Sequence, residues 1–232
     1  MKTKLTLTLI AGLLLTFTNF SDARGPKGTQ QGTCNGTCQV TETPILTELE
    51  TEHILWMRQE EKLARDVYLT LYDMYQVPVF YNIASSEQNH MNALLNLVNM
   101  YELTDTVASD EVGVFQDETF TNLYNDLVQL GSQSLIEAIK VGALIEEMDI
   151  YDIKLAIEDT QAEPVILIYE NLMRGSRNHL RAFAGLLDAF GEVYEPQYLT
   201  QEEFDQIAYS AKETGAQSKG ANSNKSRARK GR

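Results

Sequence analysis

A carboxylate and an imidazole stand three residues apart, at Glu87 and His90, in a segment whose apolar residues recur every three to four positions. In an α-helix this spacing places both side chains on one side, a single turn apart. Ile83, Leu94 and Leu97 continue that side, so it is expected to face the protein interior. A buried charged pair needs compensation, which a metal ion can provide. The pair therefore predicts that the rest of the chain brings further ligands to this point.

Composition and charge limit the class of protein. The 232 residues include 43% hydrophobic residues and 5 prolines, a balance that predicts one mostly helical domain with a single core and terminal tails. The formal net charge is −14, so nucleic acid is not expected as a partner of the folded domain.

Residues 1–23 have the pattern of a secretory signal peptide. Lys2 and Lys4 precede an apolar run over residues 5–17, and residues 21–23 supply small side chains at the expected cleavage site. A permanent membrane anchor is the alternative, but the run is too short to span a bilayer comfortably. We therefore expect cleavage near Ala23 and a periplasmic or secreted mature protein without a stable membrane span.

Two segments flank the predicted domain. Residues 24–45 are rich in Gly, Thr, Gln and Lys and are predicted to be flexible. They contain Cys34 and Cys38, for which a local disulfide is the simplest interpretation in an oxidising compartment, with a redox-active pair or a metal clip as alternatives. Residues 210–232 form a predicted disordered basic tail, suited either to contact with anionic surfaces or simply to solubility.

Helical periodicity runs through most of residues 46–209, the predicted folded domain. Long helices are expected over residues 44–76, 79–101, 135–148 and 163–190, and shorter ones over residues 117–130 and 152–158. The short connection before Pro78 makes the first two helices antiparallel. The predicted fold is all-α, an antiparallel four-helix bundle with additional short helices between helices 2 and 3 and after helix 3. A satellite segment, residues 194–209, is expected to lie back on the bundle.

Each of the four long helices carries polar residues on the apolar face, which is expected to be buried. Carboxylates and two imidazoles that converge inside a four-helix bundle form the ligand set of a di-iron or di-manganese site. Carboxylate oxygens can bridge two cations, while each imidazole fixes one position on a metal. The third histidine, His53, is predicted at the surface. The predicted metal ligands are Glu61, Glu87, His90, Glu146, Asp149 and His179.

The run from Glu61 to Tyr68, Glu-Lys-Leu-Ala-Arg-Asp-Val-Tyr, resembles the first-helix signature of rubrerythrin and its relatives. Glu87-x-x-His90 resembles the second-helix ligand pair of those proteins, and Glu146-x-x-Asp149 resembles the third-helix pair of acids. Residues 47–209 are similar to an uncharacterised ferritin-like family of bacteria and archaea, of which Gly-Ser-Arg-Asn-His-Leu-Arg-Ala-Phe is a typical phrase. This resemblance implies a ferritin-like bundle with a metal site.

One position departs from the ferritin-like pattern. The fourth helix of that pattern also carries Glu-x-x-His, whereas this chain has Ser176 before His179. Glu170 cannot substitute, because nine residues of helix turn it to the opposite side. Either Asp149 takes up the missing role or the site holds a single metal through Glu87 and the two histidines.

Simpler interpretations exist for several of these residues. Glu60 and Glu147, the neighbours of two predicted ligands, are expected on solvated faces. Tyr68 and Tyr101 are either partners near the metals or ordinary core residues. Arginines can also neutralise inner acids through buried ion pairs without any metal; those in position to do so are Arg65, Arg174, Arg177 and Arg181.

The resemblance and the ligand set together imply an exported oxidoreductase that binds two ions of iron or manganese and acts on dioxygen or peroxide. A metal-binding protein without turnover is the first alternative. A secreted helical interaction domain without metal is the second. The protein is also a possible homodimer.

Overall fold

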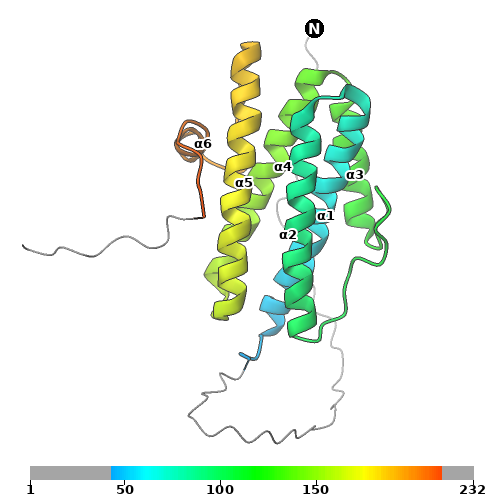
Figure 1. The fold of residues 1–232 in the computed structure, drawn as a ribbon, viewed down its shortest axis with the longest axis vertical. Helices are drawn as coiled ribbons and strands as arrows, with labels where there is room; N and C mark the ends of the chain where they lie inside the picture. The colour runs from blue at the N-terminus through cyan, green and yellow to red at the C-terminus, as the bar shows by residue number, and fades with distance from the viewer. Residues whose placement is uncertain (1–42, 216–232) are drawn as a thin grey trace, which may run out of the picture. The chain divides into compact units, whose positions relative to one another are not determined.

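The computed structural model describes residues 43–215, and this part of the chain contains six helices and no strand (Figure 1). The all-α prediction is therefore confirmed. Among these residues no helix is both long enough and apolar enough to cross a membrane. The predicted signal peptide, the segment with Cys34 and Cys38, and residues 216–232 lie outside the described residues. The helices are α1 Glu48–Tyr75, α2 Pro78–Met100, α3 Glu118–Gly131, α4 Leu135–Asp159, α5 Glu163–Phe190 and α6 Gln201–Ala208.

Local signals in the sequence account for the ends of the long helices. Thr47 and Glu50 form a capping box at the start of α1, which satisfies backbone N–H groups that have no helical partner. Gln76 ends α1 in the left-handed conformation, with φ 54°, and Pro78 then opens α2. Ser134 caps α4, and Gly191, with φ 72°, ends α5.

The fourth helix corrects one sequence prediction. Residues 135–148 and 152–158 were expected to form two helices, but α4 runs without interruption from Leu135 to Asp159. No glycine or proline stands between Met148 and Asp152 to end a helix. Ile150 and Ile153 are buried, so packing extends the apolar face across the expected break. The additional short helix after bundle helix 3 is therefore absent.

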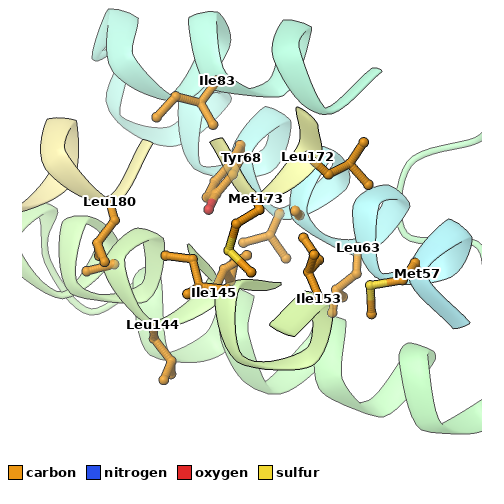
Figure 2. Close-up of a cluster of buried hydrophobic side chains, with 14 of the residues drawn as sticks. Met57, Leu63, Tyr68, Ile83, Leu144, Ile145, Ile153, Leu172, Met173 and Leu180 are labelled. Atoms are coloured by element: carbon orange, nitrogen blue, oxygen red, sulfur yellow. The ribbon is translucent and has the colours of Figure 1, made fainter. Parts of the chain in front are cut away.

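The four long helices pack in pairs, with α1 along α2 and α4 along α5, and the pairs meet where α1 contacts α4 and α2 contacts α5. Figure 2 shows Tyr68 of α1 among aliphatic side chains that include Ile145 and Leu172. Phe190, the last residue of α5, is 54% exposed. The helix α6 lies within residues 194–209, the segment predicted as a satellite, and it packs on α5.

Candidate metal centre

The six predicted ligands lie on the four long helices. Glu61 comes from α1, Glu87 and His90 come from α2, and the other three come from α4 and α5. The four carboxylate residues are each at most 2% exposed. The side chains of the two histidines are 12% and 11% exposed, so solvent reaches the cluster on the histidine side, between α2 and α5.

Glu87 lies at the middle of the cluster. Its Oε2 is 2.7 Å from Nδ1 of His90, and its Oε1 is 2.8 Å from Nδ1 of His179. On the outer side, Glu61 Oε2 lies 3.1 Å from the His90 nitrogen, and Glu146 Oε2 lies 3.3 Å from the His179 nitrogen. The result is two groups of three ligands that share Glu87, and the ligand atoms within each group lie within 4.8 Å of one another.

Several atoms at this centre are buried without a hydrogen bond of acceptable geometry. They are both oxygens of Glu87, Glu146 Oε2, His179 Nδ1 and Asp149 Oδ2. Two of these atoms, Glu87 Oε1 and His179 Nδ1, are only 2.8 Å apart. The distance would allow a hydrogen bond, but the angle between the two groups does not. Buried polar atoms without partners are rare. Carboxylate oxygens and imidazole nitrogens that converge in this way fit a pair of cations such as iron or manganese.

The acid–base properties of the cluster follow from burial and mutual charge. Burial raises the pKa of Glu61 to about 8, a rise that Glu87 reinforces and that His90 only partly offsets. Burial also opposes the charge of Glu87, but the two histidines outweigh it and lower the pKa of Glu87. Burial disfavours the imidazolium of His179, yet Glu87 and Glu146 raise its pKa to about 10. The cluster therefore retains protons at neutral pH, and a cation that binds must displace them.

Three residues outside the predicted ligand set hold the ligands in place. The hydroxyl of Tyr68 donates a 2.6 Å hydrogen bond to Oε1 of Glu146. Ser86 Oγ on α2 lies 3.0 Å from Nε2 of His179 on α5, which fixes the ring so that Nδ1 faces the acids. Gly175 on α5 makes room for the ring of His90, because a Cβ there would lie 2.5 Å from its Cε1 and Nε2.

Sequence reasoning singled out Tyr68 because it shares the face of Glu61, but it missed Ser86 and Gly175. A glycine inside an otherwise helical pattern was the available signal for Gly175. Tyr101, also suggested as a partner near the metals, is the C-cap residue of α2, about three helical turns beyond His90, and the charge of Glu50 acts on it.

The centre is asymmetric at Ser176. The pair α1–α2 provides Glu61, Glu87 and a histidine, whereas α4–α5 provides Glu146, Ser176 and a histidine. Ser176 is fully buried, and its hydroxyl donates to the backbone oxygen of Leu172 on the preceding turn. It therefore does not replace the missing carboxylate. Asp149 is buried nearby but belongs to neither group of three ligands.

The expectation that Glu60 and Glu147 face solvent is wrong, since they are only 4% and 0% exposed. Glu147 accepts hydrogen bonds from the Tyr194 hydroxyl and from the backbone N–H groups of Gln197 and Leu199. It thereby fixes the segment that leads to α6. Glu60 lies near Asp152 on α4: burial, and then the charge of the Asp152 carboxylate, raise the pKa of Glu60 well above its usual range.

Arginine does not neutralise the central acids. Arg65 pairs with Asp66 and with Asp110, in the loop after α2. Arg177 and Arg181 both bind Glu213, which fixes residues of the predicted tail that precede position 216. Within residues 43–215, the ion pairs of the central acids involve histidines only.

A family model described as "Uncharacterized protein domain (DUF2202)" matches residues 50–211. The chain belongs to this family. The DUF2202 match spans nearly all of the six helices and therefore includes every residue of the centre.

Two comparisons give the extent of this likeness. The chain is 48% identical over 170 residues to the uncharacterized protein MJ0754 of Methanocaldococcus jannaschii, which covers 73% of this chain and 92% of that protein. It also matches the crystal structure of the hypothetical protein MJ0754 from Methanococcus jannaschii, with a TM-score of 0.72 and 47% identity. That match covers 73% of this chain and 97% of the crystallised one.

Proposed function

We propose that this protein is an exported, ferritin-like four-helix-bundle protein that binds two ions of iron or manganese and acts as an oxidoreductase on dioxygen or peroxide. The observation that carries the proposal is the position of Glu87, which two carboxylate–imidazole groups share. A carboxylate between two sets of terminal ligands is an arrangement that can hold a pair of metals in a helix bundle. The packing of α1, α2, α4 and α5 supports the bundle.

The roles of the residues follow from their places. Glu87 would bridge the two ions, with Glu61 and His90 completing one ligand group and Glu146 and His179 the other. Two ions of variable valence held by these residues would supply one electron each to an oxidant. Tyr68 holds the Glu146 carboxylate at 2.6 Å, and the partly exposed histidine side leaves a path for a small molecule.

Asp149 is assigned an outer role. Its carboxylate is 2% exposed and carries an oxygen without a partner, and burial followed by the charge of Glu61 raises its pKa well above the usual range. It is therefore close enough to adjust the charge of the centre, although it stands outside both ligand groups.

Anaerobic metal loading tests the proposal. Protein purified without a histidine tag is incubated with ferrous iron, desalted and analysed for metal, and we expect two ions per chain. The double variant Glu87→Gln/His90→Ala should retain none, while Asn89→Ala, an exposed neighbour on α2, should behave as the wild type. No stoichiometric metal in the wild type, or equal metal in the double variant, would refute the proposal.

A metal-binding protein without turnover is the second candidate, and Ser176 favours it because the centre has one carboxylate fewer than the ferritin-like pattern. The iron-loaded protein is mixed with substoichiometric dioxygen or peroxide, and oxidant consumption is followed over several cycles of reduction. Repeated consumption supports the oxidoreductase. A single stoichiometric oxidation, or none, supports binding alone.

A further inference from the structure

A second set of carboxyl groups lies beside the centre, on the side where α1 faces α4. Glu60 is 4% exposed, and its carboxyl group lies close enough to that of the half-buried Asp152 for the two charges to interact. One oxygen of Glu60, Oε2, is buried without a hydrogen-bond partner. This pair therefore has one carboxyl group at the partly exposed face of α4, that of Asp152, and one in the interior, that of Glu60.

Asp149 continues this set inward. It precedes Asp152 by one turn of α4, is 2% exposed and has its own unpartnered oxygen, Oδ2. The charges of Glu61 and Glu60 both act on it, so its carboxylate lies near both the outer pair and the centre. Exposure thus decreases from Asp152 through Glu60 and Asp149 to the central carboxylates Glu61, Glu87 and Glu146.

The contrast with Asp66 on the same helix α1 shows that this set is not compensated by protein cations. Asp66 is fully buried, but Lys62 and Arg65 both pair with it. Within residues 43–215, no ion pair involves Glu60, Asp149 or Asp152, although the charge of His53 acts on Asp152. Buried carboxylates without a cation are costly, and Glu60 and Asp149 are two such carboxylates.

We propose that Asp152, Glu60 and Asp149 form a loading route for divalent cations, with a transient binding site between Glu60 and Asp152. The inference rests on the proposed metal centre. Hard divalent cations prefer carboxylate oxygens, and a site on a path must bind strongly enough to admit an ion but weakly enough to release it. Two carboxylates meet that requirement, whereas the shared three-ligand groups of the centre bind more firmly.

Stopped-flow absorption with Co²⁺ tests this route, because a ligand field of carboxylates and imidazoles gives Co²⁺ a visible spectrum. The variants are Asp152→Asn and Glu60→Gln, which preserve side-chain size, and Glu158→Gln is a control at an exposed position of α4. We expect both route variants to slow loading about tenfold, in keeping with the loss of electrostatic steering. The final number of bound ions should equal that of the wild type and of the control.

The outcomes separate the two proposals. If the wild type binds Co²⁺ and both route variants load as fast as Glu158→Gln, the loading route is wrong while the metal centre stands; ions then enter on the histidine side, between α2 and α5. A lower final number of ions in Glu60→Gln or Asp152→Asn also overturns the route, because these residues would then be permanent ligands. If the wild type binds no Co²⁺, Mn²⁺ or Fe²⁺, the centre and the route both fail. Should Glu60→Gln not fold, the half-buried Asp152→Asn decides alone.

Discussion

Glu50 connects the start of α1 to the turn between α4 and α5, and its removal should destabilise the fold. One carboxylate oxygen, Oε2, accepts hydrogen bonds from the backbone and hydroxyl of Thr47. The other, Oε1, accepts from the Thr160 hydroxyl at 2.6 Å and from the backbone N–H groups of Gln161 and Ala162. Burial alone would raise the pKa of Glu50, but these hydrogen bonds outweigh it and lower the pKa to about 2.

The size of the effect follows from the pKa. The difference between the ordinary value of 4.5 and about 2 corresponds to about 3 kcal/mol of folding free energy, at about 1.36 kcal/mol per pH unit. Because the folded-state pKa of Glu50 is depressed, this stability is fully present above pH 4.5 and is lost as the pH falls toward 2. Roughly half of it remains at pH 3.

Urea unfolding followed by circular dichroism measures this contribution. At pH 7 we expect Glu50→Gln to lose about 3 kcal/mol, and at pH 3 the difference from the wild type should shrink to about half. Glu52→Gln is the matched control, since it removes the same charge from a half-buried position in the same region of α1. The reasoning is refuted if Glu50→Gln is as stable as Glu52→Gln at pH 7, or if its deficit is the same at both pH values.

Three further predictions concern the centre. Gly175→Ala should halve the metal content, because its Cβ displaces the His90 ring, whereas Gly185→Ala, whose Cβ would meet no atom within 4 Å, should keep the content and gain about 0.5–1 kcal/mol; equal metal content in both variants would contradict this. Tyr68→Phe should lower the apo-protein's unfolding free energy by about 1–2 kcal/mol in urea, since it removes the bond to the α4 carboxylate; an unchanged value would contradict it. Because the pKa of His179 is raised to about 10, protons compete with the metal, so affinity measured by calorimetry should rise from pH 6 to pH 9, and a flat profile would count against the cluster.

Much of the helical organisation was predictable because its signals are local. Periodic apolar residues located the long helices, and Thr47, Pro78, Ser134 and Gly191 mark their ends. The prediction failed at residues 149–151. The local sequence there neither ends nor requires a helix, and burial of α4 against its neighbours makes the helix continue. Tertiary packing decides such positions, since no residue there either forbids or demands a helix.

The same division applies to the centre. Periodicity placed Glu61, Glu87, Glu146 and His179 on inner faces, and all four are buried. It misjudged Glu60, because neighbouring residues on a helix point about 100° apart and a helix enclosed on several sides buries more than one of its faces.

By itself, therefore, the sequence determined which side of each helix a side chain occupies, and hence that carboxylates and imidazoles face inward. Only the tertiary structure decided the distances and directions between helices. It placed Glu87 between two histidines at 2.7 and 2.8 Å, and it directed the arginines to Asp66, Asp110 and Glu213 instead of the central acids. The physical reason is that helical periodicity fixes a direction around one axis, whereas a shared ligand depends on how several axes pack against one another.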